Sequence, residues 1–403
     1  MLTLGQESPY ERMDSLAGIL SAETGHDSSE IRFICSPLRV CPLGAHVDHQ
    51  LGVVTGMPID RESLLAFVPG RNGEVKLRSL QFPGEVSFDL DGIPPRKKGD
   101  WGDYARGAAA VLRERYGITT GIDGIVSGRM PIGGLSSSAS VGVAYLLALE
   151  FVNGLELSKQ ENIRLDQVIE NGYLGLENGI LDQSVILLGE VGKLLVLDCA
   201  SETHDLAAPG KMPDFDIVVA YSGLSISLTG TGYNRRVSEC RESARRLLRA
   251  AGKDAGRDAR LRDVSPVEFE AHGGCLTTTL GRRAKHFFTE QERVRRGVDA
   301  WKAGNLAGLG RLMCESGRSS IDNYECGSKH LITLYDILNS VDGVYGARFS
   351  GAGFRGSCVG VSDPEARSAI QEAVENGYPE AHPDIKDEFA VDFCRTDSGA
   401  RIL

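Results

Sequence analysis

The pattern of apolar and polar positions divides the chain into a strand-rich beginning and a more helical remainder. From residue 31 to 68, apolar residues occur in short bursts (IRFIC, GVVTGMPI, LLAFV) separated by Pro, Gly and Asp, which is typical of strands joined by tight turns. Between Val75 and Leu90, apolar and polar residues alternate in two runs around the tripeptide Phe-Pro-Gly. We therefore expect an opening region that is mostly β, with a hairpin at 75–90 that has one solvated face.

Helical spacing begins near Trp101 and continues to Tyr116. The stretch 140–152 is almost wholly apolar and rich in Ala and Leu, which predicts a buried helix, and the spacing over 163–176 predicts another. Residues 185–197 have the appearance of strands, because short apolar runs are interrupted there by glycines.

The second half of the chain mixes strands with long charged helices. Strand-like runs occupy 217–221, 344–361 and 389–393, and charged helical patterns occupy 233–251 and 289–303. This mixture predicts an α+β domain.

A change of composition at 200–215, where prolines, a glycine and several charges gather, predicts a domain boundary near residue 205. A chain of 403 residues exceeds what one hydrophobic core usually serves. We therefore expect two domains, 1–205 and 206–403.

Charge and cysteine content narrow the possible functions. The formal net charge of -11 argues against nonspecific binding of nucleic acid, which depends on clustered Lys and Arg. The nine cysteines are odd in number and form no C-x-x-C pair, which disfavours a disulfide framework or a structural zinc site. The N-terminus lacks the pattern of a signal peptide, and no apolar run approaches about 18 residues. We expect a cytoplasmic protein with a small-molecule ligand, and we predict no membrane, nucleic-acid or protein partner.

The first chemical motif is a glycine- and serine-rich stretch, MPIGGLSSSAS at 130–140, directly ahead of the apolar helix. Glycines let the backbone approach a ligand, and a helix N-terminus offers unpaired N–H groups and partial positive charge, so the two together suit a phosphate chain. A serine hydroxyl can also reach a magnesium ion. The alternative for this motif alone is a flexible turn capped by serines. It is neither a Walker loop nor a G-x-S-x-G elbow.

The second motif is the turn PLRVCPLGAHVDH at 37–49, which gathers Arg39, His46, Asp48 and His49 within eleven residues. Such a cluster offers each hydroxyl of a sugar a fixed hydrogen-bond partner. The H-x-D-H spacing is also compatible with a metal site, although no further His or Cys cluster lies nearby in the sequence to complete the ligands.

Two more motifs follow. The stretch ENGYLGLENGILDQ at 170–183 carries Glu170 and Asp182, one carboxylate to take or orient a hydroxyl proton and one to hold magnesium. Each carboxylate alone is more often a cap or a solvated side chain. The loop YGARFSGAGFRG at 345–356 is a second glycine-rich segment, for which a tight connection between strands is the simpler alternative.

In this order, the four motifs resemble those of the GHMP kinase superfamily, and more closely its galactokinase-like branch, over roughly Ser36 to Val361. The resemblance implies an α+β fold of two domains. The first is similar to domain 2 of ribosomal protein S5, with a left-handed βαβ crossover, and the second is a ferredoxin-like α/β domain. The active site is expected between them. The implied activity is transfer of phosphate from ATP, with Mg²⁺, to the anomeric hydroxyl of a sugar.

The resemblance also implies a role for each matching residue. Asp182 is expected to accept the proton of the sugar hydroxyl, and Arg39 to stabilise the oxygen that becomes negative. Glu170 and one serine hydroxyl, here assigned to Ser137, are expected to hold magnesium. The remaining expected contacts are Ala45, His46, Asp48, Asp182 and Tyr233 for the sugar, and Trp101, Gly133, Gly134, Leu135, Ser136, Ser137, Ser138 and Ala139 for ATP.

Two positions depart from the galactokinase pattern. Galactokinases have Glu where this chain has Ala45, and that Glu accepts a hydrogen bond from the C6 hydroxyl of galactose. Galacturonate carries a carboxylate at C6, so a Glu there would bring two negative charges together. The sequence therefore predicts galacturonate as the substrate and galacturonate 1-phosphate and ADP as products. Arg355 stands where galactokinases have Gly, and we expect it either to meet phosphate or to prop the loop.

Two alternatives stay open at this point. If the exchange to Ala45 is neutral, the chain is a galactokinase that acts on galactose. A protein of another class, a catalytically silent sugar sensor of the galactokinase-like type, need not keep the groups for proton and phosphoryl transfer. The presence of Arg39, Glu170, Asp182 and GLSSSA argues against such a sensor.

Overall fold

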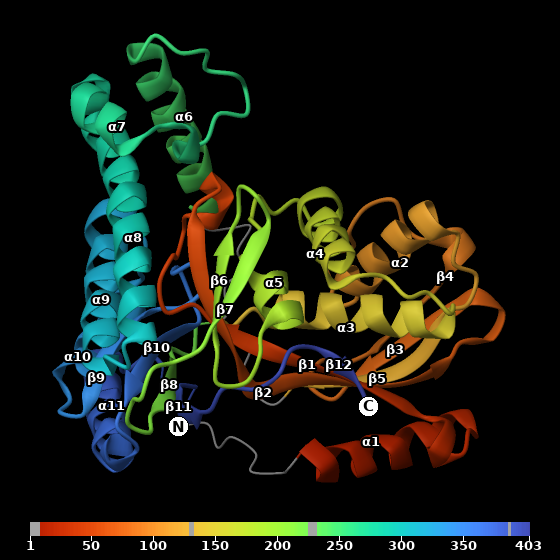
Figure 1. The fold of residues 1–403 in the computed structure, drawn as a ribbon. Helices are drawn as coiled ribbons and strands as arrows, with labels where there is room; N and C mark the ends of the chain where they lie inside the picture. Colours follow the sequence, from red (N-terminus) through yellow and green to blue (C-terminus); the bar gives the residue numbers. More distant parts are fainter. Residues whose placement is uncertain (1–8, 129–132, 225–231, 386–387) are drawn as a thin grey trace.

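The computed structural model describes residues 9–128, 133–224, 232–385 and 388–403. Within these residues the strands form one sheet of eight and one sheet of four, and helices cover both (Figure 1). The fold is α+β with two domains, as the sequence predicts. Among the described residues, no helix is long and apolar enough to cross a lipid bilayer.

The first sheet has the strand order β12-β1-β2-β5-β3-β4, and β6 and β7 extend it beside the first part of β2. Its strands are β1 (Arg32–Val40), β2 (Val53–Pro69), β3 (Glu74–Ser79), β4 (Glu85–Asp89), β5 (Ile122–Gly128), β6 (Leu194–Asp198), β7 (Thr203–Ala207) and β12 (Arg401–Ile402). The pair β3–β5 is parallel and the others are antiparallel. The hairpin expected at 75–90 is confirmed as β3–β4.

Both faces of this sheet are covered because successive side chains of a strand point to opposite sides. Ile34 and Leu65 belong to the core beneath the helices of one face, and Phe33 and Leu64 belong to the core beneath α1. In Figure 1, α1 lies on one side of the sheet and the other four helices of this region lie on the opposite side. The helices are α1 (Pro9–Thr24), α2 (Asp103–Tyr116), α3 (Ser137–Val152), α4 (Lys159–Val168) and α5 (Leu181–Leu188).

Three helix predictions can be compared with this arrangement. The helices expected at 101–116 and 140–152 are confirmed as α2 and α3. The helix expected at 163–176 is α4, which continues as one π-helical turn over Ile169–Tyr173. The strand expected from residue 185 is wrong, because 185–188 belong to α5 and β6 starts only at Leu194. An apolar run of four residues fits a buried helix as well as a strand, so periodicity cannot separate the two.

The second sheet is antiparallel with the order β11-β8-β10-β9, which puts the first and third strands of the domain in the centre, as in a ferredoxin-like fold. The predicted run 344–361 forms two strands with a glycine-rich loop between them. The strands are β8 (Asp216–Tyr221), β9 (Val344–Phe349), β10 (Ser357–Ser362) and β11 (Ala390–Cys394).

The helices of this domain pack against the sheet or against one another. The helix expected at 233–251 is confirmed as α6, and the one expected at 289–303 begins earlier, at Thr278, where the side chain of Thr277 caps it. The spacing had not indicated α9, α10 or α11. The helices are α6 (Tyr233–Ala250), α7 (Pro266–His272), α8 (Thr278–Lys302), α9 (Leu306–Ser319), α10 (Lys329–Ser340) and α11 (Arg367–Ala381).

The chain passes from the first sheet to the second between Ala207 and Asp216, and β12 returns to pair with β1 at its end. The two sheets share one apolar core, in which Leu38 and Leu135 pack with Val219 and Trp301. Loops of both domains therefore meet beside this core. The boundary at residue 205 stays a prediction.

Candidate active site

The centre of the candidate site is an ion pair between Arg39, near the end of β1, and Asp182, in the first turn of α5. The Arg39 Nε and Nη2 atoms each lie 2.8 Å from Asp182 Oδ1, and the Ser136 hydroxyl donates to Asp182 Oδ2 at 2.5 Å. The Arg39 side chain is 3% exposed whereas that of Asp182 is 24% exposed. The carboxylate is thus held by two neighbours and still open to a ligand.

The two glycine-rich loops pack against each other, although more than 200 residues separate them in the sequence. A Cβ atom on Gly133 would lie 2.8 Å from the Gly356 Cα, and one on Gly134 would lie 2.8 Å from the Ser357 nitrogen, so only glycine permits this approach. The Ser357 hydroxyl donates to the Gly133 carbonyl at 3.0 Å. The start of the predicted phosphate loop, Met130 to Ile132, lies outside the described residues.

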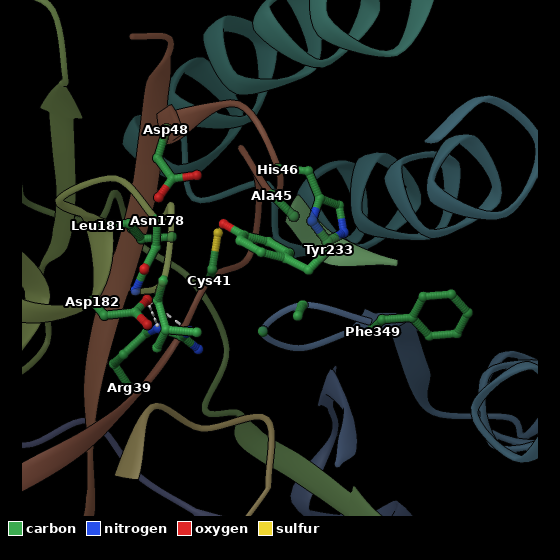
Figure 2. A pocket seen from close by; sticks show the side chains of 13 residues that line it. Arg39, Cys41, Ala45, His46, Asp48, Asn178, Leu181, Asp182, Tyr233 and Phe349 are labelled. Atoms are coloured by element: carbon green, nitrogen blue, oxygen red, sulfur yellow. Dashed lines mark hydrogen bonds and ion pairs between the residues drawn. The ribbon is translucent and has the colours of Figure 1, made fainter. Parts of the chain in front are cut away.

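A pocket opens beside the ion pair, with about 630 Å³ of empty space that is partly open to solvent. Figure 2 shows the side chains of Asp48, Asp182 and Tyr233 around it. The lining residues are Arg39, Cys41, Ala45, His46, Asp48, Leu176, Asn178, Leu181, Asp182, Tyr233, Phe349, Gly351 and Ala352. All five predicted sugar contacts therefore line one pocket that also contains the ion pair.

The pocket offers several groups suited to sugar hydroxyls. Burial and the nearby Asp182 charge raise the pKa of Asp48 to about 6. Burial, followed by the charges of Asp48 and Asp182, raises the pKa of Tyr233 well above its usual value, so its phenol stays neutral and keeps a proton to donate. Burial also lowers the pKa of His46 well below its usual value, which keeps this ring uncharged.

The alternative of a metal site at the H-x-D-H turn finds no support in the geometry. His46 stacks on Tyr324 with ring centroids 4.2 Å apart, and the His49 Nε2 atom lies 3.1 Å from the Tyr324 hydroxyl. Burial lowers the pKa of His49 to about 3. In the part of the chain that the structure describes, the one group of His, Cys, Asp or Glu side chains arranged closely enough for a metal is His330, His382 and Asp384, elsewhere in the second domain.

Acidic side chains lie buried behind the ion pair. Glu170, on the π-helical turn, accepts from Asn178 Nδ2 at 2.5 Å and from the Tyr104 hydroxyl at 3.3 Å. Asp166, one helical turn earlier, is fully buried, and neither of its carboxylate oxygens has a hydrogen-bond partner among the described residues. Burial and the negative charge of Asp182 raise the pKa of Asp166, and burial with the charges of Asp166 and Asp182 raises the pKa of Glu170. Within the described parts of the chain, no Lys or Arg is among the groups that shift these two pKa values.

A second pocket, with about 810 Å³ of empty space, lies beside the N-terminus of α3 and is mostly apolar. Trp101 and Tyr104 line it together with Ser137 and Ser138, as do Leu38, Glu62, Ser63, Ser79, Gln81, Phe82, Val126, Gly128, Val141 and Tyr145. An apolar cavity that ends at a helix N-terminus suits a nucleotide base followed by its phosphates. Among the other predicted ATP contacts, Leu135 and Ala139 are buried in the core, which leaves only their backbone for a ligand.

The sequence had not singled out Asp166 or Asn178. Asp166 precedes Glu170 by four residues, so both lie on one face of a helix, and this spacing is a signal that could have been used. Asn178 lies within the motif at 170–183, of which only the acidic residues Glu170 and Asp182 were considered. Tyr104 lies three residues after Trp101, an expected ATP contact, and its bond to Glu170 could not be seen before the fold was known. The roles assigned to individual residues stay predictions.

Comparisons with known proteins agree with this geometry. Residues 103–190 match the N-terminal domain of the GHMP kinases, and residues 298–380 match their C-terminal domain. A galacturonokinase of Arabidopsis thaliana is 45% identical to this chain and aligns with 97% of it and 98% of the relative. A galactokinase of Lactococcus lactis is 33% identical, over 89% of this chain and 90% of that protein.

The fold agrees as well. The crystal structure of a Lactococcus lactis galactokinase complexed with galactose superimposes with a TM-score of 0.89 at 31% identity, covering 97% of this chain and 100% of that one. A mevalonate kinase of Methanococcus jannaschii superimposes with a TM-score of 0.64 at 17% identity, a level that speaks for the fold alone.

Proposed function

Because this chain belongs to the GHMP kinase family, whose members use ATP, we propose that it phosphorylates the anomeric C1 hydroxyl of D-galacturonate to give galacturonate 1-phosphate and ADP. The observation that carries the choice of sugar is Ala45. It lines the pocket beside Asp48 and Tyr233, at the position where galactokinases have Glu. The galacturonokinase of Arabidopsis supports the same substrate.

The charge behind Ala45 favours an anionic sugar. The buried carboxylate of Glu290 faces two buried guanidinium groups, Arg293 at 2.7 Å and Arg348 at 3.6 Å, while the pKa of His286 is lowered to about 4, mainly by burial. One carboxylate and two guanidinium groups leave this cluster with a net positive charge. A Glu at position 45 would neutralise that charge, whereas Ala45 leaves it for the carboxylate of the substrate.

In the proposed reaction, Asp182 accepts the proton of the C1 hydroxyl as the C1 oxygen attacks the γ-phosphorus. The bond between that phosphorus and the bridging oxygen of ADP breaks, and ADP leaves with its electron pair. Arg39 orients the Asp182 carboxylate and lies close enough to stabilise the attacking oxygen while it is negative. Asp48, His46 and Tyr233 position the sugar by hydrogen bonds to its hydroxyls.

The residues at the start of α3 fit a magnesium ion. Mg²⁺ prefers oxygen ligands, and Glu170 with a hydroxyl of Ser136, Ser137 or Ser138 supplies them, Ser137 being our assignment. The partnerless carboxylate of Asp166 next to Glu170 is negative charge that a divalent cation would offset. When bound, the ion neutralises charge on the phosphates of ATP.

An ADP-release assay with galacturonate, galactose, glucuronate and glucose, in the presence of ATP and Mg²⁺, tests the proposal. We expect galacturonate to have the highest kcat/KM. Faster turnover of galactose would contradict the choice of sugar and favour a galactokinase, and no turnover of any sugar would favour a sensor.

The variant Ala45→Glu tests the physical argument. Two unit charges about 4 Å apart repel by about 4 kcal/mol at an effective dielectric constant of about 20. We therefore expect the ratio of kcat/KM for galactose to that for galacturonate to rise by about 10³-fold, since about 1.4 kcal/mol corresponds to a factor of ten. Ala45→Gln is the matched control, since it adds the same bulk without charge and should shift the ratio much less. Equal shifts in the two variants would show that size, not charge, selects the sugar.

A further inference from the structure

Arg355 lies on the loop between β9 and β10, and no anionic side chain among the described residues forms an ion pair with it. It is half-buried, and among the residues that the structure describes its side chain has no hydrogen bond or ion pair. Burial lowers the pKa of Arg355, and the groups that act against this are the hydroxyls of Tyr221 and Tyr104. A partly desolvated guanidinium group is costly unless a negative group meets it.

The loop fold holds Arg355 against the predicted phosphate loop. Its neighbour Gly356 packs directly on Gly133 and Gly134, and the next residue, Ser357, donates to the Gly133 carbonyl at 3.0 Å. The aromatic ring of Tyr221 completes this contact, because a Cβ atom on Gly133 would lie 3.0 Å from it. The Arg355 backbone is thus anchored one residue from the loop expected to wrap the phosphates.

Tyr104, the second group that raises the pKa of Arg355, also connects this residue with the predicted nucleotide pocket. Tyr104 lines the predicted nucleotide pocket with Ser137 and Ser138, and its hydroxyl donates to Glu170. Tyr104 therefore connects the lining of the predicted nucleotide pocket with the acidic cluster behind Asp182. The Arg355 guanidinium group interacts electrostatically with the Tyr104 hydroxyl, which agrees with a position facing this pocket.

This place needs positive charge. The acidic side chains of Asp166, Glu170 and Asp182 gather here, and the Arg39 guanidinium is already paired with Asp182. A triphosphate entering here meets like charge from the protein unless cations offset it. The planar guanidinium fork matches phosphate oxygens with two parallel hydrogen bonds, which a glycine at this position cannot provide.

We propose that Arg355 binds the β- and γ-phosphates of ATP through its side chain, and so contributes to nucleotide binding a contact that a galactokinase-type loop with Gly at this position lacks. The proposal rests on the kinase chemistry of the proposed function but not on the choice of sugar. It replaces the alternative in which Arg355 props the loop, since a prop would need a partner within the protein.

Titration calorimetry of the intact protein with a non-hydrolysable ATP analogue, ADP and AMP, each with Mg²⁺, tests this proposal. For Arg355→Ala and Arg355→Gly we expect the Kd of the ATP analogue to rise by about 10- to 100-fold, the usual worth of a charge-assisted contact, and the Kd of AMP to stay within about 2-fold. Arg355→Lys keeps the positive charge but not the planar guanidinium group, so its Kd for the ATP analogue should lie between those of the wild type and Arg355→Ala. The matched control Arg115→Ala removes an exposed arginine of α2 that pairs with Glu161, and should change none of these constants.

Three results would contradict a phosphate-binding role for Arg355. Unchanged Kd values for the ATP analogue and ADP in Arg355→Ala would overturn the proposal, and so would an equal loss for all three nucleotides, which would mean that Arg355 shapes the loop. A lowered melting temperature without nucleotide in Arg355→Ala but not in Arg355→Lys, together with unchanged affinity in Arg355→Lys for every nucleotide, would likewise assign a structural role. These measurements need no sugar, so a failure to phosphorylate galacturonate would leave them intact.

Discussion

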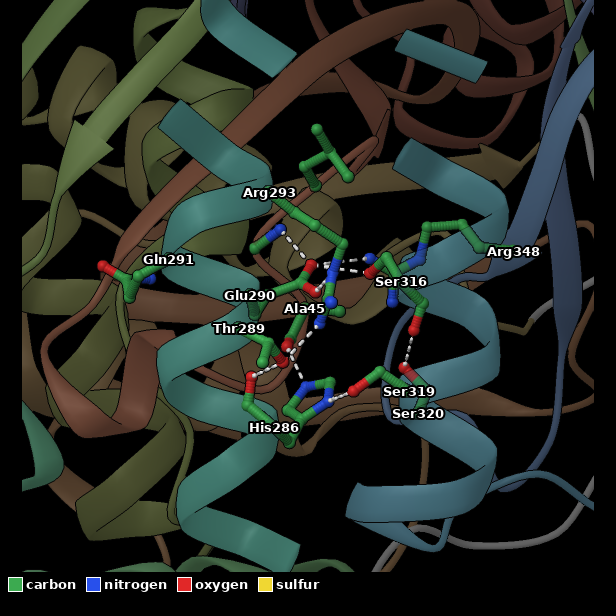
Figure 3. Close-up of polar contacts among 12 residues, drawn as sticks. Ala45, His286, Thr289, Glu290, Gln291, Arg293, Ser316, Ser319, Ser320 and Arg348 are labelled. Atoms are coloured by element: carbon green, nitrogen blue, oxygen red, sulfur yellow. Dashed lines mark hydrogen bonds and ion pairs between the residues drawn. The ribbon is translucent and has the colours of Figure 1, made fainter. Parts of the chain in front are cut away.

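Two clusters of buried charge, one around Glu290 and one around Asp166 and Glu170, differ in how their charges are balanced. In the first, the carboxylate of Glu290 accepts hydrogen bonds from the Gly44 nitrogen at 2.8 Å, the Ser316 hydroxyl at 2.6 Å and Arg293 Nε at 2.7 Å (Figure 3). The positive charges of Arg293 and Arg348 lower the pKa of Glu290 to about 2 in spite of complete burial. In the second, burial raises the pKa of both Asp166 and Glu170.

Burial alone raises a carboxyl pKa in both clusters, and the charged partners decide whether the final pKa lies above or below its usual value. The Glu290 cluster holds the turn, since Gly44 bonds to Glu290 and the carbonyl of Ala45 to His286. Among the described residues, neither carboxylate oxygen of Asp166 has a hydrogen-bond partner, and no cation lowers its pKa. We interpret the first as scaffold and the second as a site completed by substrate and metal.

The largest effect on catalysis is expected at the second cluster from Asp182→Asn. The amide keeps the shape of the side chain but cannot accept the sugar proton, and loss of a general base typically slows a reaction by about 10²- to 10⁴-fold. We expect kcat to fall by about 10³-fold while the melting temperature is maintained. Turnover above a tenth of the wild-type rate would remove Asp182 from the mechanism.

The largest effect on stability is expected at the first cluster from Glu290→Gln. This change leaves the buried guanidinium groups of Arg293 and Arg348 without an opposing charge, which costs about 3 kcal/mol in the free energy of unfolding. Glu292→Gln, two residues along α8 in an exposed pair with Arg295, is the matched control and should cost less than about 1 kcal/mol. Similar losses in the two variants, measured by denaturant unfolding, would contradict the scaffold interpretation.

Sugar binding should depend on pH through Asp48. Its pKa of about 6 means that the carboxylate that accepts sugar hydrogen bonds is present above pH 6 and becomes protonated as the pH falls through that value. We expect the KM for the sugar to rise by up to about 10-fold per pH unit below pH 6. In Asp48→Asn the KM should be high and its pH dependence flat. A wild-type KM that is constant from pH 5 to 7 would disprove this assignment.

The smallest effect on stability is expected from Asp166→Asn. It tests the comparison most directly, because this variant should raise the free energy of unfolding whereas Glu290→Gln should lower it. Asp166 holds its proton more tightly in the folded than in the unfolded protein, so its favourable contribution to stability is full below about pH 4 and is lost as the pH rises through the folded pKa. Asp166→Asn should therefore raise the free energy of unfolding at pH 8 by about 1 kcal/mol or more. The gain should vanish near pH 4, and should shrink when Mg²⁺ and a nucleotide are bound. A loss of stability at pH 8 would mean that the protein itself supplies a partner for Asp166.

Much of the candidate site could be predicted from local sequence. The chemistry of the glycines and serines at 133–138, and of Glu170 and Asp182, depends on a few neighbouring residues. The motifs alone therefore indicated phosphate binding, a sugar ligand and proton transfer. The same holds for α2, α3 and α6, whose periodicity extends over many residues. The short apolar run at 185–188 was assigned wrongly, because only packing distinguishes a buried helix from a buried strand over four residues.

The sequence by itself determined the family, the four motifs and the loss of a carboxylate at Ala45. Only the tertiary structure decided which buried charges have partners. Glu290 and Arg348 are 58 residues apart in the sequence but form an ion pair, whereas no described residue lies close enough to form a hydrogen bond with the Asp166 carboxylate. It also joined the loops at Gly133 and Gly356 and placed Arg355 beside them. The physical reason is that charge balance and close backbone contact depend on distances in space, which residue order does not state.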